Sequence, residues 1–297
     1  MNTFETDNFS RDYKELLAWI CDAGNEVSPR GLPTFEIENA VIRITDPSTT
    51  QPIGQNRGYS PGILAAEMLQ WLSGTSDLVQ LNAVSKDRFL NYSDDGVVLY
   101  GAYGPRAYAT LNRAARILKK DPDSRQAVAV LWDGREVDET KDLPCTLSWG
   151  FRLRDGKLKM TTTMRSNDAW RGMAYDLTCM TRIGSAMAWA LGVEFDEYTH
   201  VAYSLHVYHS DHDAISALTP VDSNAQQPPM LDGGEVSDID RWLYMRLQAL
   251  SALDGPHPDL PESFAWYAEK LKGTPRGARM CVRCRYFVDD LKYCACL

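Results

Sequence analysis

The sequence of 297 residues lacks any run of eighteen apolar residues, so no helix is expected to span a membrane. Positive charge is also scarce: 31 Lys and Arg residues stand against 40 Asp and Glu residues, a formal net charge of −9 at pH 7. Broad binding to polymeric nucleic acid or to an anionic membrane needs a basic surface, and neither is expected here. A small anionic ligand is not excluded, because a few local arginines are enough to bind it.

A secretory signal and an even set of cysteines are also missing. Residues 1–11 are polar and acidic, the opposite of the basic and apolar start of a signal peptide. Seven cysteines without such a signal indicate a reducing cytoplasm instead of a disulfide framework. A hydrophobic fraction of 44% and a charged fraction of 24% indicate an ordinary soluble globular protein.

Helix-like and strand-like segments follow one another irregularly, which favours one main α+β domain. Helices are expected at residues 12–23, 63–72, 106–120, 175–191 and 239–252, and again after Pro261. Strands are expected at residues 35–44, at 127–132, which should be buried, and at 201–208. Asp155-Gly156 predicts a β-hairpin that joins residues 146–153 to residues 157–164. We expect a catalytic domain over residues 1–225 and a C-terminal extension of the same unit over residues 226–297.

Cys145 is the first candidate for chemistry, although a cysteine after a proline is more often structural than catalytic. A thiolate nucleophile needs nearby positive charge to lower its pKa. Arg165 lies at the far end of the predicted hairpin, so the strands return it to the side of Cys145. Arg165 and Ser166 offer a guanidinium and a hydroxyl, which suit a phosphate; a surface strand end is the alternative.

The motifs around Cys145 resemble those of the thymidylate synthase family. They are Asp-Pro-Asp-Ser-Arg (121–125), Pro-Cys (144–145), Asp-Gly-Lys-Leu (155–158), Arg-Ser-x-Asp-x-x-x-Gly (165–172) and His-x-Tyr (206–208), with weaker matches at residues 29–31 and at Glu67 and Gly74. The resemblance covers residues 12–213. It implies an α+β fold with a mixed or antiparallel sheet flanked by helices, and a homodimer formed through that sheet. It also implies transfer of a one-carbon unit from 5,10-methylenetetrahydrofolate to C5 of a pyrimidine nucleoside monophosphate, in the cytoplasm of a bacterium or of a phage's host.

The resemblance assigns a role to each matching residue. Cys145 would add to C6 of the pyrimidine, Glu67 would relay protons, and Tyr103, with Tyr100 as its rival, would assist proton removal from C5. The residues that would hold the 5′-phosphate are Arg30, Arg165 and Ser166, together with Arg125 of the partner subunit. The residues that would contact the folate are Asp168 and Gly172, and those that would bind the sugar 3′-hydroxyl are His206 and Tyr208.

Asp176 departs from the pattern, because the uracil-using members have asparagine at this position. Cytosine presents an amino donor at C4 and a bare N3, and a carboxylate accepts from the amino group and favours protonation at N3. Asp176 therefore predicts a catalytic and base-binding role toward a cytosine nucleotide, and dCMP is preferred to CMP. The alternative is a carboxylate that only complements a helix N-terminus.

The same exchange is found in the family's deoxycytidylate hydroxymethylases, so we expect a 5-hydroxymethyl product and tetrahydrofolate. The alternatives are a (d)CMP methylase, a thymidylate synthase that acts on dUMP, and an inactive member that binds nucleotide or RNA. Further departures are Thr146 for a histidine, Met164 for a glutamine and Gln126 for an arginine. Around Phe89 the synthases have a tryptophan that shields the transferred carbon from water.

Two clusters raise the question of a metal. The C-terminal thiols form a C-x2-C-x9-C-x-C pattern that predicts either a structural zinc site or free thiols; they are Cys281, Cys284, Cys294 and Cys296. Near His206 lie two more histidines and two aspartates, but the resemblance already uses His206 for the sugar. No metal is expected in the active site.

Overall fold

The computed structural model describes residues 2–52, 57–134, 139–219, 227–234, 241–256 and 258–274, and the backbone of 279–280 and 287–288. Its centre is a mixed sheet of strand order β1-β3-β8-β6-β5-β4, in which β2 pairs with β3 and β7 with β8. The strands are β1 (Thr3–Thr6), β2 (Asn25–Val27), β3 (Thr34–Ile44), β4 (Val128–Val130), β5 (Thr146–Arg154), β6 (Lys157–Met164), β7 (Asn167–Asp168) and β8 (Glu194–Tyr208); a separate pair is β9 (Arg279–Met280) and β10 (Phe287–Val288).

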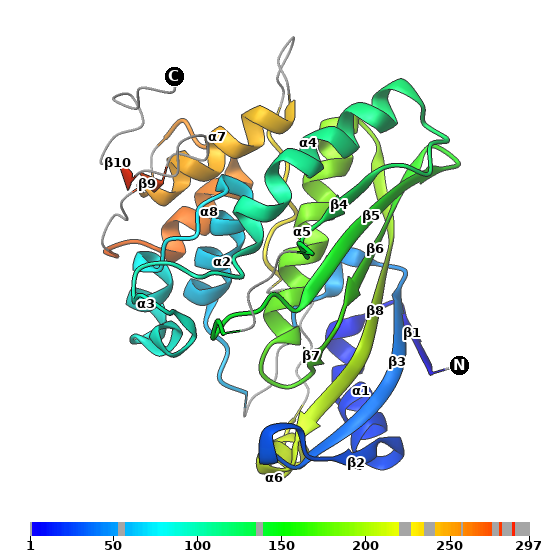
Figure 1. Cartoon of the computed structure of the whole chain (residues 1–297). Coiled ribbons are helices and arrows are strands. Elements are labelled where there is room, and N and C mark those ends of the chain that lie inside the picture. Colours follow the sequence, from blue (N-terminus) through cyan, green and yellow to red (C-terminus); the bar gives the residue numbers. More distant parts are fainter. Residues whose placement is uncertain are drawn as a thin grey trace.

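The helices gather on one side of this sheet (Figure 1). They are α1 (Phe9–Ala23), α2 (Pro61–Ser73), α3 (Val79–Ser85), α4 (Tyr103–Lys120), α5 (Met173–Leu191), α6 (His212–Ser216), α7 (Arg241–Leu253) and α8 (Glu262–Lys270). Short 3-10 turns lie at η1 (Pro29–Gly31), η2 (Pro47–Thr49), η3 (Arg88–Tyr92) and η4 (His209–Asp211). The core forms where α1, α4 and α5 cover the apolar face of the sheet, and α2 packs against α4 and α5. The predicted α+β class with a mixed sheet flanked by helices is confirmed.

The predicted hairpin is confirmed, because β5 and β6 pair antiparallel from Thr146 opposite Met164 to Arg154 opposite Lys157. Asp155 and Gly156 both have positive φ, 53° and 75°, as the tight turn requires. This hairpin returns the chain to its starting point. It therefore brings Arg165, which follows β6, back beside Cys145, which precedes β5.

Two strand predictions need correction. Residues 127–132 were expected to be buried, but β4 is the edge of the sheet, and Val128 and Val130 are 38% and 51% exposed. An edge strand covered on one face alone buries alternate residues, here Ala129. The strand expected at residues 201–208 is the end of the much longer β8. Where the apolar alternation of β3 slips, Asn39 adopts a left-handed backbone with φ 52°.

The C-terminal helices share the main core. α7 packs against α2 and α5, and its Trp242 and Met245 are buried, as are Phe264 and Tyr267 of α8. The predicted boundary at residue 225 stays a prediction. The four clustered cysteines, Cys281, Cys284, Cys294 and Cys296, lie outside the described residues.

Candidate active site

Arg165 is fixed against the chain that leads into Cys145. Its backbone N–H donates to the Cys145 carbonyl at 2.9 Å, and its guanidinium donates to the carbonyls of Pro144 at 3.0 Å and Leu143 at 2.9 Å. The two strand ends of the hairpin are thereby joined. The guanidinium is held beside the thiol, as the sequence predicted.

The Cys145 thiol is mostly enclosed, and burial raises its pKa. Arg165 opposes this effect and Arg30 does so more weakly, while Asp176 and Asp142 raise the pKa further. The thiol and the Asp176 carboxyl therefore belong to one site. Before a ligand arrives, the balance leaves the thiol protonated at neutral pH.

Tyr103 lies directly over the start of β5. Its hydroxyl oxygen accepts the Thr146 backbone N–H at 3.2 Å, and burial, with Asp176 and Cys145 adding to it, raises the pKa of the phenol. Its rival Tyr100 has the Arg106 guanidinium 5.0 Å from its ring. Tyr103 is thus in hydrogen-bond contact with the residue after Cys145.

Asp176 occupies the first turn of α5, and its Oδ2 accepts a hydrogen bond of 2.8 Å from Asn167 Nδ2. Burial raises its pKa to about 7; the Asn167 amide lowers it and Asp168 raises it. Gly172 at the start of α5 gives this carboxyl its room, because a Cβ there would lie 3.2 Å from Asp176 Oδ2. The carboxyl therefore changes charge near neutral pH.

Glu67 enters the same space from α2. Its Oε2 is buried and has no hydrogen-bond partner among the described residues. Burial, aided by the charge of Asp176, raises its pKa to about 8. A protonated carboxyl without a partner is suited to hold water or a ligand group and to transfer a proton.

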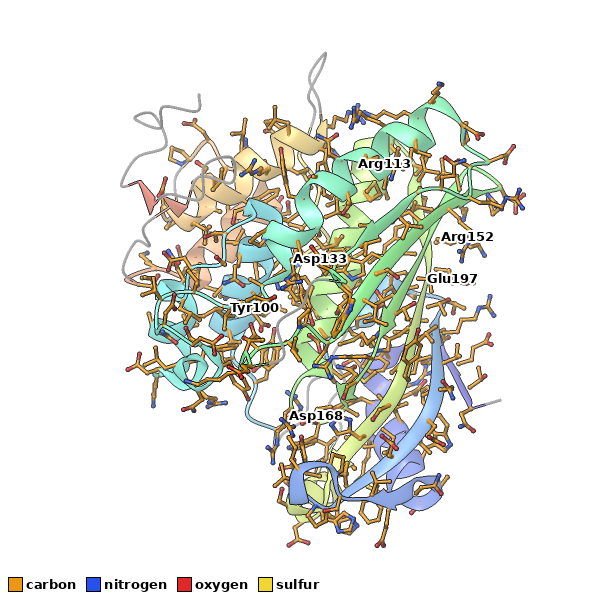
Figure 2. The ribbon with its side chains drawn as sticks, in the orientation of Figure 1. Tyr100, Arg113, Asp133, Arg152, Asp168 and Glu197 are labelled. Carbon is orange, nitrogen blue, oxygen red and sulfur yellow. The ribbon has the colours of Figure 1, made fainter. Side chains whose placement is uncertain are left out.

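Asp168, His206 and Tyr208 form a second wall, in which β7 aligns Asp168 with His206 of β8. Asp168 Oδ1 accepts the backbone N–H groups of Trp170 at 3.0 Å and Arg171 at 2.9 Å, and Figure 2 shows this residue near the start of α5. Burial lowers the pKa of His206, although Asp168 acts to raise it. The Tyr208 ring lies 5.5 Å from the His206 ring and 4.7 Å from the Arg171 guanidinium.

The predicted phosphate residues divide into two groups. Arg30, in η1 with φ 56°, acts electrostatically on both Cys145 and His206, and Ser166 follows Arg165 in sequence. Arg125 forms the other group, because it lies far from Cys145. The β4–β5 register, with Val128 opposite Gly150, directs it toward the far end of β5, and nine strand residues span roughly 30 Å. Within one chain, Arg125 therefore does not join Cys145.

Two site residues were missed from the sequence, Asn167 and Arg57. Asn167 fills the free third position of the Arg-Ser-x-Asp motif, which was the available signal. Arg57 is 9% exposed, donates to the Trp170 carbonyl at 2.6 Å and lies over the rings of Trp170 and Tyr175, with Nε and Nη1 unpartnered among the described residues. It stands in a Gly- and Gln-rich connection with no regular period, so nothing local identified it.

Polar atoms without hydrogen-bond partners lie beside aromatic rings, and this combination suits a folate, which is flat and polar at its edge. Among the described residues, Arg57 Nε and Nη1 and Glu67 Oε2 lack partners, and Trp170 and Tyr175 offer flat apolar surfaces. Asp168 and Gly172, predicted as folate contacts, adjoin this wall at the start of α5. In the part of the chain that the structure describes, no three His, Cys, Asp or Glu side chains group to hold a metal ion. No described helix is long and apolar enough to cross a membrane.

Comparison with known proteins identifies relatives of this chain. The deoxyuridylate hydroxymethyltransferase of Bacillus phage SP01 is 34% identical over 233 residues, which is 72% of this chain and 61% of that protein. The deoxyuridylate hydroxymethyltransferase of Pseudomonas phage M6 is 29% identical over 249 residues, 80% of this chain and 69% of that protein. The thymidylate synthase of Corynebacterium aurimucosum is 27% identical over 212 residues, 67% of this chain and 78% of that protein.

This chain thus spans less than two thirds of the length of the phage SP01 protein. The family model described as thymidylate synthase matches residues 11–248, well over half of the chain. The match runs from α1 into α7, and it includes the hairpin, α5 and β8 that build the site. The chain belongs to the thymidylate synthase family.

Proposed function

We propose that the protein transfers a one-carbon unit to C5 of a pyrimidine deoxynucleoside monophosphate and leaves it there as a hydroxymethyl group. The observation that carries this proposal is the convergence of the Cys145 thiol, the Asp176 carboxyl and Glu67 on one space, where Asp176 raises the pKa of both other groups. A thiol nucleophile, a base-reading carboxyl and a proton relay are what C5 chemistry on a pyrimidine requires.

The proposal gives each of these residues a role in the reaction or in binding. Cys145 loses its proton to water, and the charge of Arg165 favours the resulting thiolate, which forms a covalent bond to C6 and makes C5 nucleophilic. Tyr103, beside Cys145, would hold the water that accepts the C5 proton. Glu67 holds water and exchanges protons with the ring. Arg30, Arg165 and Ser166 would hold the 5′-phosphate, and His206 and Tyr208 the sugar.

Bound 5,10-methylenetetrahydrofolate would supply the one-carbon unit, and Asp168, Gly172 and Arg57 are the residues that would hold it. Release as hydroxymethyl requires water at the carbon attached to C5. The names of the two phage relatives support this outcome over methylation. A second support is Phe89 in η3, at a place where synthases of the family carry a shielding tryptophan.

For the base we propose uracil, hence dUMP, because both phage relatives are named for deoxyuridylate. Asp176 is compatible with this base in its neutral form, which a pKa of about 7 makes available. A carboxylic acid donates through O–H to the C4 carbonyl and accepts from N3–H, as an amide does. The aspartate therefore does not by itself exclude uracil.

Cytosine, hence dCMP, is the second candidate and rests on the ionised form of Asp176. A carboxylate accepts from the C4 amino group but offers no donor to a carbonyl. Hydroxymethylation of dCMP, the prediction drawn from the sequence, stays a prediction, as does the choice between deoxyribose and ribose.

The test is the product mass after incubation with 5,10-methylenetetrahydrofolate and dUMP, dCMP or CMP. We expect a gain of one CH2O unit on dUMP; a gain of one CH2 unit means methylation instead. Cys145→Ser should abolish the product, and Cys21→Ser, a free thiol on α1, should leave it unchanged. No product with any nucleotide would contradict the proposal and favour an inactive nucleotide-binding protein.

A further inference from the structure

Asn167 has a buried side-chain amide, of which the nitrogen makes a hydrogen bond and the oxygen does not. It is 3% exposed in β7, where its backbone is paired with Leu205 of β8. Its Nδ2 donates to Asp176 Oδ2 at 2.8 Å, while its Oδ1 has no partner among the described residues. Nothing described hydrogen-bonds Asp176 Oδ1, so this oxygen is free for a ligand, and Oδ2 keeps a second lone pair that can accept from a base.

The direction of this hydrogen bond fixes where a proton can reside. An N–H that points at Asp176 Oδ2 needs a lone pair there, so the proton of the neutral acid is directed to Oδ1. If the amide turned over, its carbonyl would face Oδ2 and require the proton at that oxygen. Asp176 Oδ1 would then be an acceptor. The amide orientation therefore decides whether the free oxygen donates or accepts.

We propose that Asn167 is a specificity-determining positioning residue that holds the Asp176 proton on Oδ1, so that the site presents a donor to a C4 carbonyl and selects uracil over cytosine. The inference rests on the proposed function and extends it. An aspartate without this amide holds its proton on either oxygen and reads both bases. With the amide, neutral Asp176 behaves toward the base like an asparagine in one fixed orientation.

Several titratable groups face Asp176 and contribute to its charge state. They are Glu67 of α2, Tyr103 of α4, Cys145 before β5, Asp168 of β7, Cys179 of α5 and Tyr198 of β8. Burial and Asp168 favour the neutral acid, whereas the Asn167 N–H favours the carboxylate. Removal of the amide donor must therefore move the titration of Asp176 to higher pH.

The test is calorimetric binding of dUMP and of dCMP between pH 5.5 and 9 to wild type, Asn167→Leu and Asn167→Ser. In wild type, dUMP binding should weaken above the Asp176 pKa of about 7, and dCMP binding should not. In both variants the weakening should begin at higher pH. Discrimination between the nucleotides should fall roughly tenfold, the upper end for one hydrogen bond between neutral groups. Two variants of different size keep the test valid if one fails to fold.

Thr178→Val is the matched control, because this buried residue of α5 hydrogen-bonds to Thr50, Gln51 and Ala174 and not to Asp176. It should lower Tm and leave both the pH profile and the discrimination unchanged. Unchanged profile and discrimination in the Asn167 variants would overturn the inference while the proposed function stands. Failure of wild type to bind either nucleotide would instead overturn the proposed function.

Discussion

The reactivity of Cys145 depends on the competition between burial and the charge of two arginines. Burial raises the pKa of the thiol, and Arg165 is the largest opposing influence. The guanidinium is held in place by two backbone carbonyls before the cysteine, so it cannot swing away without breaking both hydrogen bonds. The hairpin therefore holds the Arg165 guanidinium beside the Cys145 thiol.

Arg165→Gln should slow alkylation of Cys145 by iodoacetamide at pH 8 by about tenfold, because loss of the charge raises the thiol pKa and lowers the thiolate fraction. The measurement is the alkylation rate at Cys145, followed by peptide mass. Arg171→Gln is the control, since this arginine pairs with Asp211 at 2.8 Å and adjoins Tyr208. Equal rates in wild type and Arg165→Gln would show that the arginine does not activate the thiol.

Asp176→Asn should remove the decline in dUMP use above pH 7 and further reduce use of dCMP. An amide does not titrate, and it donates to the uracil carbonyl at every pH, whereas wild type donates only below a pKa of about 7. The measurement is kcat/KM for each nucleotide across this pH range. A variant with the wild-type nucleotide preference and pH profile would remove Asp176 from base reading.

At the scale of single residues, the sequence was enough to pair groups at the two ends of one hairpin. It was not enough to predict their charge states. Cys145 and Arg165 could be paired because a hairpin of known turn returns to its start. The partner of Asp176 could not, since Asn167 meets it only when α5 begins over β7. The raised pKa values of Glu67 and Asp176 follow from burial, which no local pattern in α2 or α5 reveals.

Among the elements, α5 is the one that connects the site to the sheet, and it lies very close to β8. A Cβ added at Gly184 would lie 2.4 Å from the Phe195 ring, so glycine permits the helix to approach that strand. Asp176 is two turns closer to the start of the same helix. The placement of the carboxyl therefore depends on this close packing.

Gly184→Ala should destabilise the protein by about 1–3 kcal/mol, the usual cost of overpacking a core. Gly150→Ala, whose added Cβ meets its nearest atom at 3.9 Å, is the matched control and should cost much less than Gly184→Ala. The measurement is the urea midpoint of each variant. Similar midpoints for both variants would show that α5 can move away from β8 without cost.

His200 of β8 ties the stability of the sheet to pH. It is fully buried, its Nδ1 lies 3.0 Å from the Tyr198 hydroxyl, and burial lowers its pKa to about 3. Between pH 6.5 and 3, His200 is protonated in the unfolded chain, where its pKa is near 6.5, but stays neutral in the folded protein. Stability is therefore fully present above pH 6.5 and is lost as the pH falls toward 3.

His200→Leu should remove this loss, so that between pH 6.5 and 4 the variant gains about 1.4 kcal/mol relative to wild type for each unit of acidification. The measurement is the difference in unfolding free energy at pH 7, 5.5 and 4. A difference that does not change with pH would mean that His200 takes up its proton in the folded protein.

At the scale of the whole molecule, the two faces of the sheet are covered differently. Helices cover one face, while Arg152 and Glu197 project on the other side, as Figure 2 shows. Arg43, Lys159 and Glu197 form ion pairs on that face. The resemblance predicts a homodimer through the sheet, and this stays a prediction. It agrees with the position of Arg125, which lies too far along the hairpin to serve Cys145 of its own chain.

A test of the dimer is complementation between two inactive variants, Cys145→Ser and Arg125→Glu. If Arg125 acts in the partner's site, a mixed dimer has one site with both defects and one intact site. Random exchange of subunits in an equal mixture then restores about a quarter of the wild-type activity. Cys145→Ser mixed with Arg165→Gln is the control, because both residues lie in the same chain's site and no intact site can form. Activity that stays at the level of the separate variants would show that Arg125 does not complete a partner's site.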